Sequence, residues 1–201
     1  PVPNPGPGQV LVEVHAAGVD RGVWHLATGR PFAIRAFGYG LRRPKQPVLG
    51  SDVAGVVVGV GAGVTRFAEG DRVFGTADGS YAELALAKED QLAHKPEGLS
   101  FAEAATAAAS GITALRAVED ATAVKRGDRV LVFGASGGVG SHAVQLAHAA
   151  GATVVGVASA AKAELVLSLG ASRGGGPAAP PGPAEAPPDA PVKPAGGRPP
   201  P

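Results

Sequence analysis

Cysteine and methionine are both absent from the 201 residues of this chain, and aromatic residues are scarce, with one tryptophan, two tyrosines and six phenylalanines. The lack of cysteine excludes a disulfide scaffold, every cysteine-ligated zinc site and any cysteine nucleophile. Because a chain without disulfides needs no oxidising compartment, we expect a cytoplasmic location. A chain that begins at Pro1 and contains no methionine is also expected to lack its true start.

The chain also has no large excess of charge of either sign, since it contains 18 Lys and Arg residues and 17 Asp and Glu residues. A neutral chain lacks the basic surface that nucleic-acid binding requires, so we expect no nucleic-acid partner. The longest apolar run, residues 53–64, is interrupted by glycine and is shorter than the roughly 20 residues of a membrane-spanning helix. We therefore expect no membrane partner and no signal peptide.

Proline and glycine, in contrast, are abundant and are concentrated near the end of the chain. Residues 173–201 contain 11 of the 19 prolines. Such a segment buries too little apolar surface to offset the entropy cost of ordering, so we predict a disordered tail over residues 173–201. Its proline runs are short and irregular, which argues against a Pro-rich interaction protein.

The first hundred residues carry the pattern of short β-strands. Residues 9–16 alternate apolar and polar side chains, and residues 53–60, 71–74 and 80–87 are apolar segments bounded by glycine-containing turns. Short strands at this spacing are typical of a small barrel. We predict a β-rich domain over residues 1–99.

From Ser100 onward the pattern is that of an α/β fold. Ser100 begins a capping box ahead of one helix, and a second helix is predicted because Ile112, Leu115 and Val118 recur at helical spacing. A strand, a glycine-rich turn, a helix, a second strand and a further helix follow over residues 129–133, 134–140, 139–150, 153–158 and 161–169. This βαβα order implies a parallel sheet, so we interpret residues 100–172 as linking helices and the first part of a doubly wound domain.

The glycine-rich turn follows a buried strand and opens a helix. Small residues let the backbone approach the pyrophosphate of a dinucleotide, and the helix N-terminus stabilises its negative charge. The second strand that follows supports a dinucleotide site, although a turn needed only for packing of the helix on the strand is the alternative. The predicted cofactor-binding residues of the turn are Gly134, Ala135, Ser136, Gly137, Gly138, Val139 and Gly140.

The end of the second strand distinguishes the two nicotinamide cofactors. An NAD site usually has Asp or Glu there to bind the ribose 2′-hydroxyl, and a cationic or hydroxyl group replaces it when a 2′-phosphate must fit. No acid lies between Val157 and Lys162, so we predict that Ser159 and Lys162 bind the 2′-phosphate and that NADPH is preferred over NAD. For Lys162, an ordinary solvated lysine in the first turn of a helix is the alternative.

Several ordered motifs resemble the medium-chain dehydrogenase/reductase superfamily. They are PVLGSDVAGVV at residues 47–57, GAGVTRF at 61–67, GDRVFG at 70–75, GITAL at 111–115 and the glycine turn, and the match covers about residues 7–172. Within the superfamily, the chain most resembles the zinc-independent quinone oxidoreductases (zeta-crystallin-like) and the NAD(P)-dependent alcohol dehydrogenases. The resemblance implies a GroES-like catalytic domain and a Rossmann domain, the latter incomplete because residues 173–201 cannot supply its second half.

The same resemblance locates the zinc ligands of zinc-dependent relatives at Asp20, Ser51 and about Ala109. Alanine cannot bind a metal, and the structural zinc lobe of those relatives needs four cysteines, so the resemblance implies no metal site. Without zinc, hydrogen-bond donors must stabilise the oxyanion that develops as hydride arrives from the nicotinamide. We therefore expect a catalytic site without a metal.

The candidate catalytic residues are Asp20, Ser51, Thr113 and His25. Ser51 and Thr113 are hydroxyl donors, and Thr113 is also the candidate for a contact to the bound dinucleotide. Asp20 stands where relatives often have Asn or Asp, but it is equally placed to cap a short helix. His25 could relay a proton, but the hydroxyl residue of the relay in zinc-dependent relatives is replaced by Gly22, so a partly buried helix histidine is the favoured alternative.

We interpret the family activity as NADPH-dependent, zinc-independent transfer of hydride to a quinone, an enone or another carbonyl substrate. The chain alone is expected to turn over no substrate, and a non-catalytic fragment or pseudo-enzyme with weak nucleotide binding is the alternative. Aromatic residues between Arg30 and Arg43 indicate an apolar or aromatic small-molecule substrate. The family implies a homodimer, which the incomplete Rossmann domain disfavours.

Overall fold

The computed structural model describes residues 2–30, 48–176 and 190–192, the last three by their backbone. The chain divides into two compact units, residues 1–109 and 110–201. The sequence placed the boundary at residue 100, but helix α2 (Phe101–Ala105) belongs to the first unit. Its Ala104 and Ala105 share a buried cluster with Ala54 of the sheet.

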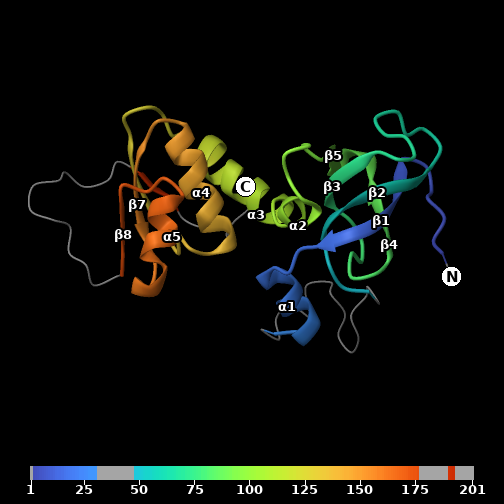
Figure 1. Ribbon diagram of the computed structural model, residues 1–201, viewed down its shortest axis with the longest axis horizontal. Coiled ribbons are helices and arrows are strands. Elements are labelled where there is room, and N and C mark those ends of the chain that lie inside the picture. Colours follow the sequence, from blue (N-terminus) through green and yellow to red (C-terminus); the bar gives the residue numbers. More distant parts are fainter. Residues whose placement is uncertain (1, 31–47, 177–189, 193–201) are drawn as a thin grey trace, which may run out of the picture. The chain divides into compact units, whose positions relative to one another are not determined.

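The first unit contains a five-stranded antiparallel sheet with the order β4-β1-β2-β3-β5 (Figure 1). Its strands are β1 (Gln9–Ala17), β2 (Asp52–Val60), β3 (Arg72–Thr76), β4 (Leu84–Lys88) and β5 (Leu92–His94), and its helices, besides α2, are α1 (Arg21–Thr28) and the 3-10 helix η2 (Glu89–Gln91). Among the described residues this sheet runs open from β4 to β5 instead of closing into the small barrel that strand spacing predicts. The sequence does not predict strand β5, because three residues are too few to show a clear periodicity.

Alternation along the strands separates a buried face of this sheet from an exposed one. In β1, Val10 and Val12 are fully buried and Glu13 is exposed, although Leu11 between the two valines is also buried. Val57 of β2 and Val73 of β3 are buried in the same cluster. Branched apolar side chains of neighbouring strands thus form the core of the first unit, as a half-buried antiparallel sheet requires.

The second unit contains the parallel sheet that the βαβα pattern predicts, with the order β8-β7-β6-β9. Its strands are β6 (Arg129–Phe133), β7 (Thr153–Val157), β8 (Arg173–Gly175) and β9 (Ala190–Val192). Its helices are α3 (Ala108–Leu115), which begins in the first unit, the π-helix η3 (Arg116–Ala121), α4 (Gly138–Ala149), the 3-10 helix η4 (Ala160–Lys162) and α5 (Ala163–Ser168). Helix α4 packs on β6 and β7, and α5 packs on β8 (Figure 1).

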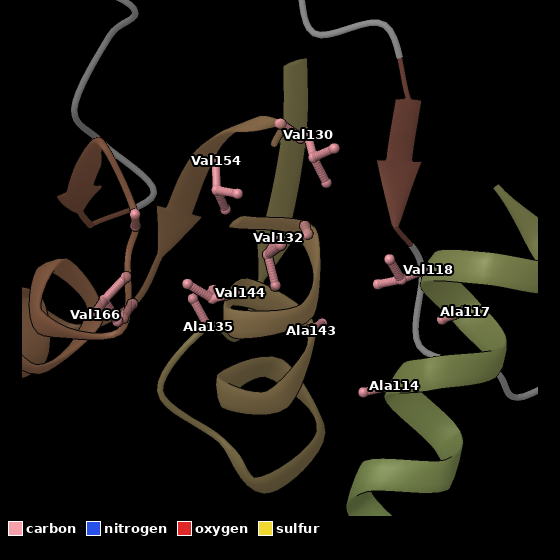
Figure 2. Packing of buried hydrophobic residues seen from close by; sticks show 14 residues of the cluster. Ala114, Ala117, Val118, Val130, Val132, Ala135, Ala143, Val144, Val154 and Val166 are labelled. Atoms are coloured by element: carbon pink, nitrogen blue, oxygen red, sulfur yellow. The ribbon is translucent and has the colours of Figure 1, made fainter. Parts of the chain in front are cut away.

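The core of the second unit combines valines of the sheet with small residues of the helices. Figure 2 shows Val132 of β6 and Val144 of α4 close together, with Ala117 and Val118 of η3 at another side of the cluster. All four side chains are almost fully buried. Alanine in the helices allows their backbones to approach the sheet closely, so the parallel strands are covered on the faces where such a sheet must be buried.

The helical segment formed by α3 and η3 is only partly buried. Of the three residues whose spacing predicts a helix, Val118 is buried, but Ile112 and Leu115 are 49% and 39% exposed. The rest of the buried face includes Ala114 and Ala117. Helical periodicity locates the helix but not its buried face, because small residues can face the core. Throughout the described ranges, no helix combines the length and the apolar character that crossing a membrane requires.

Two short strands lie within the segment that the sequence predicts to be disordered. β8 pairs with β7, and β9 pairs with β6 from Val130 to Val132, both in parallel. For the six residues of these strands, the prediction of disorder differs from the structure. Backbone hydrogen bonds to an existing strand need no apolar periodicity of their own, which is why composition did not reveal them.

Candidate functional site

The glycine turn joins the end of β6 to the start of α4. Gly134 adopts a φ of 70°, in the left-handed region that favours glycine, and its carbonyl accepts a hydrogen bond from the Gly137 N–H at 2.9 Å. A Cβ on Gly140 would overlap the same carbonyl and lie 2.9 Å from the Cα of Ala135. Only glycine at position 140 therefore lets α4 pack this closely on the turn, in the tight backbone path that a dinucleotide site requires.

The start of α4 presents backbone donors at this turn. The helix is 12 residues long and begins at Gly138. Its N-cap residue is Gly137, which has no side chain to accept hydrogen bonds from the first N–H groups. These groups have no partner within a helix, and together with the helix dipole they favour an anion. Ala135 is buried, whereas Ser136 and Val139 are half-buried. The seven predicted residues thus form one continuous backbone turn that fits a pyrophosphate.

Ser159 and Lys162 lie just beyond the end of the neighbouring strand. Phe133 at the end of β6 is in register with Val157 at the end of β7, so both parallel strands end at the same edge of the sheet. Ser159 is the N-cap of η4, but its side chain makes no capping hydrogen bond, and both Ser159 and Lys162 are exposed. Ligands of open α/β sheets bind outside the carboxyl ends of the strands, which is where these two side chains lie.

In the first unit, Asp20 and Ser51 are brought together from distant parts of the sequence. Asp20 is the N-cap of α1, and its Oδ1 accepts a hydrogen bond from the Val23 N–H at 2.9 Å. Its Oδ2 accepts a hydrogen bond from the Ser51 hydroxyl at 3.3 Å. The capping role that the sequence left open is therefore present, and the second carboxylate oxygen still faces Ser51.

Asp52, the residue after Ser51, is a buried carboxyl with 2% of its surface exposed. Its Oδ1 accepts a hydrogen bond from the Ala109 N–H at 3.2 Å, and its main-chain carbonyl accepts one from the Gly18 N–H at 3.2 Å. Burial raises the pKa of Asp52 to about 6, an effect that the Ala109 N–H opposes and the negative charge of Asp20 strengthens. The cluster therefore holds a carboxyl that takes up a proton well above its ordinary pKa.

Tyr81 is a member of this cluster that sequence analysis missed. Its hydroxyl donates a hydrogen bond to the Gly18 carbonyl at 3.0 Å, across 63 positions of sequence. Burial, together with the negative charges of Asp20 and Asp52, raises the pKa of Tyr81. No local pattern marks this tyrosine, because its contact with the β1–α1 loop exists only once the strands have paired.

His25 and Thr113 are not part of the Asp20 and Ser51 pair. His25 lies on α1, is half-buried, and its Nδ1 lies 2.7 Å from the Arg30 carbonyl. This arrangement agrees with the alternative of a partly buried helix histidine. Thr113 lies half-buried on α3 in the second unit. The substrate pocket expected between Arg30 and Arg43 lies, except at Arg30, outside the described residues.

At the three positions that bind zinc in zinc-dependent relatives, the side chains of this chain are a poor set of metal ligands. Both carboxylate oxygens of Asp20 are engaged, by Val23 and by Ser51, and Ala109 offers only a methyl group. In the part of the chain that the structure describes, no three His, Asp or Glu side chains gather where they could hold a metal ion. The chemistry of these side chains does not fit a zinc site.

Comparisons with known proteins agree with this architecture. The family of the alcohol dehydrogenase GroES-like domain matches residues 6–97. The quinone oxidoreductase of Mus musculus is 41% identical over 174 residues, which are 85% of this chain and 50% of the relative. The crystal structure of the CurK enoyl reductase superposes with a TM-score of 0.80 at 30% identity, over 87% of this chain and 53% of that chain.

A further solved structure is the Escherichia coli quinone oxidoreductase complexed with NADPH. It superposes with a TM-score of 0.73 at 30% identity, over 86% of this chain and 51% of that chain. The chain spans about half the length of the curated relatives it matches. The GroES-like sheet, the parallel sheet with its glycine turn, and these matches agree with the resemblance of the sequence motifs, and the chain belongs to the medium-chain dehydrogenase/reductase superfamily.

Proposed function

We propose that this chain contributes the cofactor turn and catalytic residues of an NADPH-dependent, zinc-independent oxidoreductase that acts on a quinone, an enone or another carbonyl compound. The observation that carries the proposal is the glycine turn at the carboxyl edge of the parallel sheet, with exposed Ser159 and Lys162 beside it. Relatives named quinone oxidoreductase and enoyl reductase support this reaction class.

The preference for NADPH is argued from charge and hydrogen bonding. A 2′-phosphate at the end of β7 would meet the Ser159 hydroxyl and the Lys162 ammonium, and the described residues 158–163 contain no carboxylate to repel it. The solved structure of the Escherichia coli quinone oxidoreductase with NADPH supports use of a nicotinamide cofactor. We therefore place the 2′-phosphate at Ser159 and Lys162.

The catalytic role is assigned to hydrogen-bond donors of the first unit. Bound nicotinamide cofactor supplies hydride chemistry, and the residues of this chain must stabilise the negative charge that develops on the substrate oxygen. Ser51 has a hydroxyl held at 3.3 Å from Asp20, and rotation of that hydroxyl would direct its proton to a substrate oxygen. Thr113 is proposed as a cofactor contact, and His25 as a helix residue without a direct catalytic role.

The cofactor assignment is tested by fluorescence titration of the full chain with NADPH and with NADH. We expect Ser159→Ala and Lys162→Ala each to weaken NADPH binding by about tenfold and to leave NADH binding nearly unchanged, because only NADPH carries the 2′-phosphate. Lys125→Ala is the matched control, since Lys125 is also exposed but precedes β6. Absence of binding at millimolar NADPH would contradict the proposed function.

A non-catalytic nucleotide-binding role is the second candidate. The observation that favours it is the sheet of four strands in the described residues, where a complete doubly wound dinucleotide domain has about six. Oxidation of NADPH in the presence of a quinone separates the two candidates, because a binding module would bind the cofactor and consume none. The cytoplasmic location remains a prediction, and the homodimer remains what the family implies and the incomplete Rossmann domain disfavours.

A further inference from the structure

The hydroxyl of Ser110 lies beside the first residue of α4. Ser110 is on α3, in the second unit, and a Cβ built on Gly138 would lie 2.8 Å from the Ser110 Oγ and 3.6 Å from its Cβ. The Oγ therefore occupies the space where any larger residue at position 138 would place its side chain. A hydroxyl from a different helix thus stands at the N-terminus of α4.

This hydroxyl has no hydrogen-bond partner among the described residues. Ser and Thr in helices commonly donate to a carbonyl three or four residues earlier, as Ser141 does to Gly138 at 2.9 Å and Ser168 does to Leu165 at 2.8 Å. Ser110 is half-buried and makes no such bond. A partly buried hydroxyl without a protein partner is available to water or to a ligand.

Packing beside Ser110 holds its helix, α3, against α4. A Cβ on Gly111 would lie 3.6 Å from the Cδ2 of His142, so the start of α3 lies against the first turns of α4. The Nδ1–H of His142 donates to the Gly138 carbonyl at 2.9 Å, which fixes the orientation of the ring. The contact between the two helices is therefore preformed and brings Ser110 to the backbone donors of the turn.

We propose that Ser110 donates a hydrogen bond to the pyrophosphate of the dinucleotide bound at the glycine turn. The proposal rests on the proposed function, because it assigns a further ligand to the same site. An oxyanion bound at the start of α4 would accept hydrogen bonds from the N–H groups of the turn and from the nearby Ser110 hydroxyl. A hydroxyl that donates to a charged oxygen forms one of the stronger hydrogen bonds in proteins.

The test compares Ser110→Ala with Ser168→Ala in the full chain, by titration with NADPH and with NADH. We expect Ser110→Ala to weaken the binding of both cofactors by the same factor, about tenfold, because both carry the pyrophosphate. Ser159→Ala is expected to weaken NADPH binding alone. Ser168→Ala removes a hydroxyl that is bonded within α5 and is expected to change neither affinity. Thermal unfolding of all variants checks that Ser110→Ala folds like the unsubstituted chain.

The outcomes separate this proposal from the function on which it rests. If the unsubstituted chain binds neither cofactor, the proposed function fails and the role of Ser110 fails with it. If the chain binds NADPH and Ser110→Ala binds it equally well, the role of Ser110 is overturned while the function stands. A loss of affinity accompanied by an equal loss in Ser168→Ala, or by a lower unfolding temperature, also overturns the role, because it indicates a structural effect.

Discussion

The polar cluster of the first unit and the glycine turn of the second unit are assembled in different ways. The cluster joins side chains from three separate segments, with Ser51 bound to Asp20 and Tyr81 bound to the Gly18 carbonyl. The turn consists of consecutive residues, and its shape is set by backbone contacts such as that of Gly137 with Gly134. A backbone site therefore depends on glycine at certain positions, whereas a side-chain site depends on the pairing of strands that are distant in sequence.

The largest expected effect comes from a substitution that disrupts the backbone of the glycine turn. In Gly140→Ala, the added Cβ would overlap the Gly134 carbonyl, so the turn or α4 must shift. We expect a loss of about 3 kcal/mol in the free energy of unfolding and a loss of measurable NADPH binding. Chemical denaturation and fluorescence titration measure the two effects. Gly98→Ala is the control, because a Cβ there meets no atom within 4 Å; wild-type affinity in Gly140→Ala would show that backbone approach at the turn is not needed.

The second prediction concerns how the stability contributed by the polar cluster of the first unit depends on pH. Since the pKa of Asp52 is raised to about 6 in the folded protein from an ordinary 3.8, the folded state binds its proton more tightly than the unfolded state. Stability due to this proton is present below pH 3.8 and is lost as pH rises through about 6. Asp52→Asn is therefore expected to gain stability relative to the unsubstituted chain between pH 4 and pH 7, by about 1–3 kcal/mol.

Urea denaturation at a series of pH values measures this difference, and Glu103→Gln provides a control of opposite sign. Hydrogen bonds from the Ser100 N–H and hydroxyl lower the pKa of Glu103, so its contribution is present at neutral pH and is lost as pH falls. Glu103→Gln should accordingly be less stable than the unsubstituted chain at neutral pH and approach it in acid. A difference for Asp52→Asn that does not change with pH would mean that burial leaves this carboxyl unperturbed.

The smallest expected effect concerns the hydrogen bond between Tyr81 and the Gly18 carbonyl. Tyr81→Phe removes only the hydroxyl that donates to the Gly18 carbonyl, and this residue is 39% exposed. We expect a loss of about 0.5–1 kcal/mol, at the lower end for a hydrogen bond because water can reach the site. Urea denaturation beside Ser168→Ala, which loses a local hydrogen bond, is the comparison. A Tyr81→Phe variant as stable as the unsubstituted chain would remove Tyr81 from the account of the cluster.

Much of the fold could be predicted because its signals are local. Strand β6 occupies residues 129–133 as predicted, and Ser100 and Glu103 form the capping box that begins α2. The βαβα order implied the parallel sheet, and the GroES-like part agrees with the matched family. Such features depend on the period of apolar residues and on cap residues a few positions apart.

Other features could not be predicted because they depend on tertiary contacts. Asp20 and Ser51 were both predicted as candidate catalytic residues, but their hydrogen bond could not be predicted, because it follows from the placement of β2 beside β1. Tyr81 and Ser110 carry no motif, since each matters only through a residue far away in sequence. Strand β9 lies in a Pro-rich segment whose composition predicts disorder, yet its backbone pairs with β6. Pairing with an existing edge is a property of the folded sheet and not of the added segment.

The most direct test of the central claim, that a dinucleotide binds to the backbone of the glycine turn, is the amide NMR spectrum of the ¹⁵N-labelled chain during titration with NADPH. We predict that the largest shifts fall on the amides of residues 135–140, with further shifts at Ser110 and Ser159. Saturating shifts at these positions would support the backbone site. Shifts confined to other residues, or no shifts at millimolar NADPH, would contradict it.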